Sequence, residues 1–169
     1  MKLFICIVIG LLIPMYGCSE NISVAETQGR ALINIWENGN IEDLDKIMSA
    51  NPVYEAAQQN HSYKGLEEVK SYVGHVVLFA KDLKIEIISV ISTKSSATIE
   101  WVMTGIQDRP ISDIITVPTN KEFMVKGVTL IEVEDGLITK ATDYMDVLGF
   151  VIQLGAKVEL PGGVVLEMK

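Results

Sequence analysis

The residue best placed to do chemistry in this sequence is Asp146, which ends the last long β-type segment. Side chains two positions apart in a strand share a face, so Thr142, Tyr144 and Asp146 lie on one face and Asp143 on the other. If the first face lines an apolar cavity, desolvation raises the pKa of the Asp146 carboxyl and suits it to proton transfer. A second role is equally open, because Asp is a favoured N-cap and an apolar segment begins at Val147.

An earlier β-type segment supplies the apolar face that such a carboxylate needs. Trp101 and Met103 alternate with more polar residues, so we expect their side to be packed and to line the cavity. The segment ends at Gln107, whose amide can donate or accept a hydrogen bond but cannot transfer a proton. With Asp146 as the base at a carbon next to a carbonyl, Tyr144 or Gln107 would stabilise the enolate oxygen.

Other polar and aromatic residues are weaker candidates. Tyr54 and Glu55 lie in a short extended piece and could contact a ligand in the cavity, although a solvated Glu is the commoner case. Tyr63 is expected to be an ordinary core or rim tyrosine. His61 lies in a polar loop, and His75 lies opposite the apolar stripe of its helix. The sequence has no His-x-x-His pair and no cysteine cluster, so it predicts no metal site.

Helices followed by strands must position these residues. Helical spacing predicts a first helix at 24–38, ended by Gly39; Asn40 is expected to cap a short second helix, and Gly65 to open a third. Period-two alternation then predicts four strands, at 83–91, 98–107, 122–133 and 137–146. Helices first and antiparallel strands afterwards indicate an α+β fold, with the helices on one face of a curved sheet.

The remaining segments are expected to be less regular. Residues 52–57 are predicted to be a short extended piece, and 58–64 a polar loop. Near the C-terminus, Pro161-Gly162-Gly163 separates two β-like pieces, at 157–160 and 164–166. The sequence leaves open whether these pieces add an edge strand, cover a pocket or support a dimer.

The stretch from Asp135 to Gly155 has a specific pattern. An Asp-Gly turn is followed by a strand that ends on Asp146, and an apolar segment closes with Gln153-Leu154-Gly155; Pro118-Thr119-Asn120-Lys121 lies upstream. In this order the chain resembles the SnoaL-like polyketide cyclases and ester cyclases, a branch of the nuclear transport factor two-like superfamily. The resemblance implies a cone-shaped, curved antiparallel sheet with three N-terminal helices packed on its concave face. It also implies that Asp146 is the acid/base of an aldol-type ring closure that uses no metal or organic cofactor.

Two positions depart from the usual pattern of that family. The family often has Gly-Thr-His at the end of the Trp-containing strand, where this chain has Gly105-Ile106-Gln107. It also often has Trp four residues before the Asp, where this chain has Thr142. Both departures fall where the chemistry would be, and they favour a domain that binds a ligand without converting it.

The N-terminal residues are predicted to be an export signal. Lys2 precedes an apolar run at 3–15, which is typical of a secretory signal and shorter than the ~20 residues of a membrane span. Met15-Tyr16-Gly17-Cys18 is similar to a bacterial lipobox, in which the cysteine becomes lipidated; plain cleavage nearby is the alternative. We therefore expect a signal peptide at 1–17, lipidated Cys18 with a tether at 18–23, and one domain at 24–169 in the bacterial cell envelope.

Charge narrows the classes of partner. The whole chain has a net charge of −8, and without Lys2 it has 13 basic and 22 acidic residues, a net charge of −9. No basic cluster is present to neutralise phosphates, so we exclude nucleic acid as a partner. The same charge would repel an anionic lipid surface, so we expect membrane contact only through the lipid anchor. Cys6 leaves with the signal, so Cys18 remains alone and no intramolecular disulfide can form.

These observations support functions of different classes. The first is an exported, cofactor-free acid/base lyase or isomerase that acts by aldol-type cyclisation or enolisation of a hydrophobic carbonyl compound. The alternative is a non-catalytic lipoprotein that binds a small hydrophobic molecule. A third is a structural homodimer module whose cavity is filled.

Overall fold

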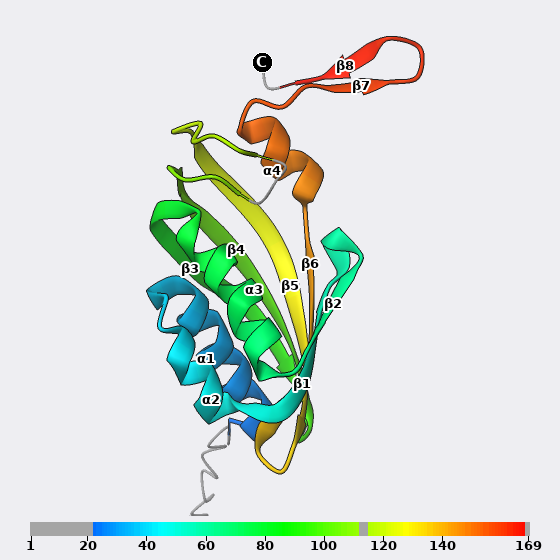
Figure 1. The fold of residues 1–169 in the computed structure, drawn as a ribbon. Coiled ribbons are helices and arrows are strands. Elements are labelled where there is room, and N and C mark those ends of the chain that lie inside the picture. Colours follow the sequence, from blue (N-terminus) through cyan, green and yellow to red (C-terminus); the bar gives the residue numbers. More distant parts are fainter. Residues whose placement is uncertain (1–21, 112–114, 168–169) are drawn as a thin grey trace, which may run out of the picture.

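The computed structural model describes residues 22–111 and 115–167, and it confirms the expected α+β fold with a curved sheet (Figure 1). Its main sheet has six strands in the order β2-β1-β6-β5-β4-β3. These strands are β1 (Met48–Ala56), β2 (His61–Lys64), β3 (Ala80–Ser92), β4 (Ser96–Gln107), β5 (Glu122–Glu134) and β6 (Leu137–Met145). The helices are α1 (Val24–Asn38), α2 (Leu44–Ile47), α3 (Leu66–Leu78) and α4 (Val147–Gln153), with short 3-10 turns η1 (Ile41–Asp43) and η2 (Ala57–Gln59). Helix α1 packs on β3, β4 and β5, and α3 packs on β1.

Helix α1 begins and ends where the sequence predicts. The Ser23 hydroxyl accepts a hydrogen bond from the Glu26 N–H (3.0 Å), and Gly39 ends the helix with a left-handed φ of 72°. The second helix differs from the prediction, because it consists of η1 followed by the single turn of α2. The Asn40 side chain does not cap the backbone there; its amide donates to the Asp43 carboxylate instead (2.7 Å).

The four predicted strands are β3 to β6, and a turn with positive φ at Asp135 (49°) and Gly136 (83°) joins the last two. Two features were not predicted. Strand β1 pairs with β6 in parallel, whereas the other pairs of the main sheet are antiparallel. Residues 61–64, expected as loop, form β2 on the free side of β1. Pro52 fits inside β1 because it lies where the β1–β6 register shifts.

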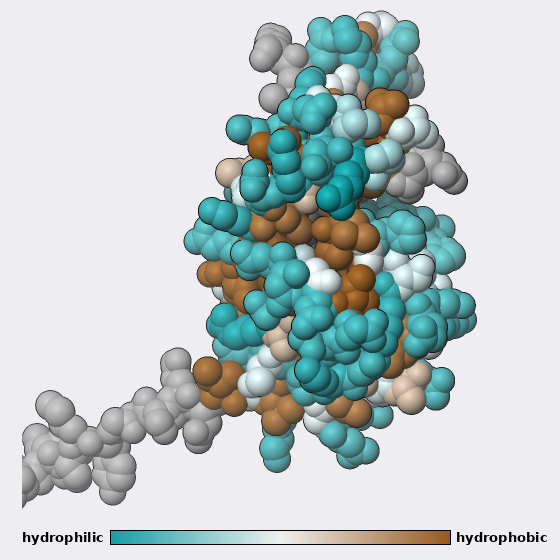
Figure 2. All heavy atoms as spheres, turned by 60° about the vertical axis from the view of Figure 1, so that its left-hand side comes forward, coloured by the Kyte–Doolittle hydropathy of each residue, from teal (hydrophilic) through white to brown (hydrophobic). Residues whose placement is uncertain are grey.

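Side chains of the helices and of the concave sheet face form one core. The Trp101 ring lies across β5 at Gly127, where an added Cβ would come within 2.3 Å of it. This close approach explains why glycine occupies position 127. Trp101 and Met103 are both buried in the core, which confirms the side predicted for them. Figure 2 shows one face of the molecule, where apolar groups gather between mostly hydrophilic surroundings.

The C-terminal residues form a hairpin of their own. Within residues 22–111 and 115–167, strands β7 (Val158–Leu160) and β8 (Val164–Leu166) pair only with each other, and they lie beyond α4 in Figure 1. Both β-like pieces are therefore confirmed, and they do not join the edge of the main sheet.

The predicted signal peptide, Cys18 and most of the tether lie outside the described residues. Across 22–111 and 115–167, no helix is both long enough and apolar enough to cross a membrane.

Candidate acid/base site

A buried carboxyl group lies inside the cone, and it belongs to Asp143, which is only 2% exposed. The Tyr54 hydroxyl donates a hydrogen bond to its Oδ2, and the Thr129 hydroxyl donates one to its Oδ1 (2.7 Å). Thr129 in turn accepts a hydrogen bond from Nε1 of Trp101 (2.9 Å). A hydroxyl can donate once and accept as well, so this chain of bonds satisfies every partner and fixes the carboxyl in place.

Four adjacent strands position this network. Thr129 on β5 lies directly opposite Asp143 on β6. Tyr54 on β1 lies opposite Ala141, two residues before Asp143 and on the same face of β6. Trp101 reaches Thr129 from β4. The site therefore depends on the parallel pairing of β1 with β6 and on the register of β5 against β6.

Burial sets the electrostatics of the site. Removal from water raises the pKa of the Asp143 carboxyl from 3.8 to about 7, while the hydrogen bonds from Tyr54 and Thr129 act in the opposite direction. Burial, and then the charge of Asp143, raise the pKa of Tyr54 well above its ordinary value, so this phenol stays a donor. A carboxyl that titrates near neutral pH can both take up and release a proton there.

Aromatic rings surround the carboxyl group. Trp36 of α1 meets Trp101 edge-on with ring centroids 5.7 Å apart, and Tyr72 of α3 lies 5.2 Å from Tyr54. The Nε1–H of Trp36 is buried and has no hydrogen-bond partner in the part of the chain that the structure describes. These side chains fill the interior, so the cavity predicted around Trp101 and Met103 is occupied by the protein's own rings.

Asp146 and Tyr144 do not face this interior, so the placement predicted for them is wrong. Tyr144 is 54% exposed, and Asp146 is exposed as well. The Oδ1 atom of Asp146 accepts a hydrogen bond from the Gly149 N–H (2.9 Å) and caps α4. The alternative role for Asp146, as an N-cap, is therefore the one that the structure shows.

The sequence did carry a signal for the true inward face. The inward positions of β5 are apolar apart from Thr129, and a lone polar residue in such a stripe needs a partner. If β5 and β6 paired regularly from the turn at 135–136, Thr142 would lie opposite Thr129. A shift in register between Glu132 and Val133 places Asp143 there instead. Burial of three successive residues, 141–143, also hides the alternation on β6.

Gln107 is buried, but its amide holds a loop and does not face Asp143. Its Nε2 donates to the carbonyl oxygens of Arg109 and Val117 (3.2 Å to the latter), and its Oε1 accepts from the Thr119 N–H (2.5 Å). With these bonds made, the amide has no geometric reason to stabilise an enolate in the cone. The expectation for Gln107 as an oxyanion donor is not supported by its position.

Glu55 and Thr142 lie opposite each other on the other face of the sheet from Tyr54 and Asp143. Glu55 forms an ion pair with Lys140 (3.2 Å) and accepts a hydrogen bond from Thr142 (3.0 Å). These two contacts lower the pKa of Glu55. Tyr54 lines the interior as predicted, whereas Glu55 and Thr142 do not.

The two histidines are both exposed, as expected. Among the described residues, no group of three His, Cys, Asp or Glu side chains is arranged to hold a metal ion.

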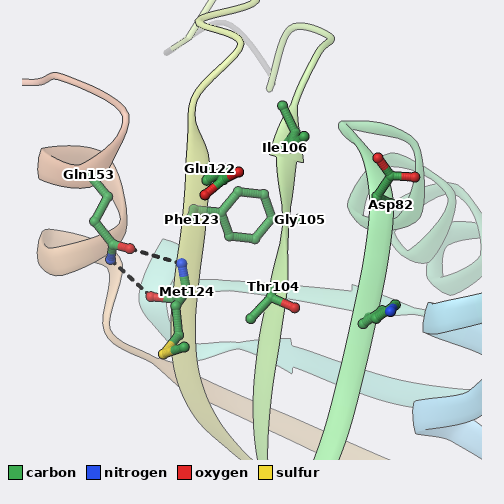
Figure 3. A pocket seen from close by; sticks show the side chains of 9 residues that line it. Asp82, Thr104, Gly105, Ile106, Glu122, Phe123, Met124 and Gln153 are labelled. Atoms are coloured by element: carbon green, nitrogen blue, oxygen red, sulfur yellow. Dashed lines mark hydrogen bonds between the residues drawn. The ribbon is translucent and has the colours of Figure 1, made fainter.

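A shallow depression of about 510 Å³ lies on the sheet away from Asp143 (Figure 3). It is lined by Asp82, Lys84, Thr104, Gly105, Ile106, Glu122, Phe123, Met124 and Gln153. Gln153 donates to the Met124 carbonyl (2.9 Å) and accepts from its N–H (2.8 Å), which gives β5 a partner beyond the end of β6. Gln153 is thus a structural part of the motif at 146–155.

Comparison with known proteins places this fold. The family model described as a SnoaL-like domain matches residues 30–141. TsrD from Streptomyces laurentii is similar with a TM-score of 0.69 at 21% identity, over 79% of this chain and 96% of that one. A proposed SnoaL-like polyketide cyclase from Jannaschia sp. CCS1 has a TM-score of 0.68 at 16% identity, over 79% of this chain and 94% of that one. An LEH-like epoxide hydrolase from M. tuberculosis has a TM-score of 0.59 at 18% identity, over 78% and 89%. No curated protein matches the chain.

Proposed function

The chain belongs to the family of SnoaL-like domains, and on this premise we propose that it is a cofactor-independent acid/base lyase or isomerase whose proton-transfer group is Asp143. One observation carries this proposal: a carboxyl with a pKa near 7 is held by Tyr54 and Thr129 inside the aromatic cone. A general acid or base works best when its pKa lies near the working pH.

The chemistry follows from the groups around this carboxyl. The ionised Asp143 would take a proton from a carbon next to a carbonyl group, which breaks the C–H bond and leaves an enolate. The Tyr54 hydroxyl has a single proton and already donates it to Asp143, whereas the buried Trp36 N–H lacks an acceptor in the described residues. Trp36 could therefore donate to the enolate oxygen. Protonated Asp143 then returns the proton to another carbon of the enolate. Alternatively, the enolate carbon attacks a second carbonyl and closes a ring, and the alkoxide that forms takes the proton back from Asp143.

One structural neighbour, from Jannaschia sp. CCS1, is a proposed polyketide cyclase, and this agrees with the proposed class of reaction. We extend the cyclase type to this chain, with a hydrophobic carbonyl compound as the substrate, because the walls of the site are aromatic and apolar.

A second function, binding without conversion, is favoured by the hydrogen bonds that Asp143 already makes. Both oxygens of its carboxyl accept a hydrogen bond, and Tyr54 and Trp101 beside it are fully buried. If the rings move apart to admit a small hydrophobic ligand, such a domain would bind it without converting it, and Asp143 would then only order the core.

Deuterium exchange at the α-carbon of β-keto esters and cyclic ketones separates the two functions. With wild-type protein in D₂O we expect exchange above the buffer rate, and Asp143→Asn should abolish it. Asp146→Asn is the matched control, since Asn also caps helices and this side chain lies outside the cone. Exchange that is equal in wild type and Asp143→Asn would refute Asp143 as the base. A bound ligand recovered unchanged, with no exchange in wild type, would favour the binding function.

We also propose that the protein is exported and anchored through lipidated Cys18, as the lipobox-like Met15-Tyr16-Gly17-Cys18 indicates. Metabolic labelling with palmitate in a bacterial host tests this. Wild type should carry the label in the membrane fraction, and Cys18→Ser should lose it. Equal labelling of both would refute the anchor.

A further inference from the structure

We propose that Tyr63 controls access to Asp143, and that small molecules reach the site between α3 and the η2–β2 segment at 57–64. This inference rests on the proposed function in treating Asp143 as the site. Tyr63 would then decide the size of molecule that is admitted.

A series of rings connects Asp143 with solvent. Tyr54, which is bonded to Asp143, lies 5.2 Å from Tyr72, and Tyr72 stacks on Tyr63 with centroids 4.4 Å apart and planes at 20°. Tyr63 in turn meets His61 edge-on at 4.5 Å. Along this series the side chains change from fully buried Tyr54 and buried Tyr72 to half-buried Tyr63 and exposed His61. Tyr63 is therefore the outermost ring that packs directly on the buried tyrosines over the carboxyl.

The outer and inner layers are attached to different parts of the fold. Tyr72 belongs to α3, which packs in the core, whereas the Tyr63 hydroxyl donates to Gln59 in its own segment (3.1 Å). Gln58 links the two layers by donating to the Tyr72 hydroxyl (3.2 Å). Its Oε1 is buried and has no hydrogen-bond partner among the described residues. Tyr63 can thus move with its segment when the stack, the Gln58 bond, the bond from the Lys64 N–H to Glu68 of α3 (2.9 Å) and the pairing of β2 with β1 separate.

The segment is built to move more easily than the rest of the sheet. Strand β2 is short and lies at the sheet edge, with β1 as its neighbour (Figure 1). Positive φ angles flank it, at Asn60 (51°) and Gly65 (85°), so the chain turns sharply on both sides. Segments with few buried contacts and one-sided pairing open at lower free energy than core strands.

Quenching of tryptophan fluorescence by acrylamide tests the route without any substrate. The chain has two tryptophans, Trp36 and Trp101, and both are buried beside the site. We expect Tyr63→Ala to raise the quenching constant several-fold. Tyr63→Phe keeps the ring and should behave as wild type. The matched control is Tyr144→Ala, which removes an exposed tyrosine from the opposite face of the sheet and should also leave quenching unchanged.

Unchanged quenching in Tyr63→Ala would overturn the inference, and so would an equal rise in Tyr144→Ala, which indicates general loosening. If Tyr63→Ala does not fold, amide hydrogen exchange of the wild type tests instead whether the segment opens. Residues 61–64 must then exchange faster than 101–103 of β4, and equal protection overturns the proposal. Raised quenching without proton exchange in any variant would support the entrance and refute the acid/base function. Unchanged quenching together with proton exchange that depends on Asp143 would refute the entrance and support the acid/base function.

Discussion

Replacement of Asp143 by Asn should remove a loss of stability that the wild type suffers as the pH rises. The pKa of this buried carboxyl is raised from 3.8 to about 7 in the folded protein. Between these pH values the folded state binds more protons than the unfolded state, so the free energy of unfolding falls with rising pH. The slope reaches about 1.4 kcal/mol per pH unit and is smaller near the two pKa values, so the stability lost by this group between pH 4 and pH 7 amounts to about 3 kcal/mol. An Asn side chain is neutral throughout and loses nothing.

Urea denaturation from pH 4 to pH 8, followed by tryptophan fluorescence, measures this effect. The difference in unfolding free energy between Asp143→Asn and wild type should rise by about 4 kcal/mol over this range, because all other titrating groups are common to both proteins. The matched variant Asp146→Asn, at the exposed cap of α4, should show a nearly constant difference. A constant difference for Asp143→Asn would refute the claim that its pKa is raised by burial.

Three further substitutions test the packing and capping that support the site. Gly127→Ala should destabilise the fold by about 1–3 kcal/mol in thermal or urea unfolding, because the new methyl group would lie 2.3 Å from the Trp101 ring; stability equal to wild type would contradict this contact. Gln153→Ala removes both bonds to the Met124 backbone and should cost about 1 kcal/mol in the same assay, and no loss would mean that water replaces the amide. Asp146→Ala should cost about 1 kcal/mol through the lost cap while leaving deuterium exchange at the substrate carbon intact; lost exchange would restore a catalytic role for Asp146.

The parts of the fold with strong local patterns could be predicted from the sequence. Helix α1 has a helical apolar stripe between two turn-forming ends, and β4 alternates cleanly around Trp101, so local physics decides both. Strand β1 could not be identified in the same way, because it contains Pro52 and its partner β6 lies more than 80 residues later. Its parallel pairing arises from the tertiary fold and leaves no periodic pattern in the chain.

The sequence predicted the kind of group at the candidate site, a carboxyl, but not the residue that carries it. An inward carboxyl at the end of the last strand was expected, and the structure provides one three residues earlier than Asp146. The choice between Asp143 and Asp146 depends on which face of β6 points inward. The shift in register at Glu132 exchanges the two faces relative to a hairpin that pairs regularly from its turn. Tyr72 approaches from α3, so no strand pattern could have revealed it.

The most direct test of Asp143 as the proton carrier is a titration by ¹³C NMR of its side-chain carboxyl, assigned by comparison with Asp143→Asn. We expect a midpoint at about pH 7. We also expect a higher midpoint in Tyr54→Phe, because the Tyr54 hydroxyl lowers this pKa by donating to the carboxylate. A midpoint near 3.8 in the wild type would contradict this role of Asp143, because such a carboxyl would be fully ionised at neutral pH and could not serve as a proton carrier there.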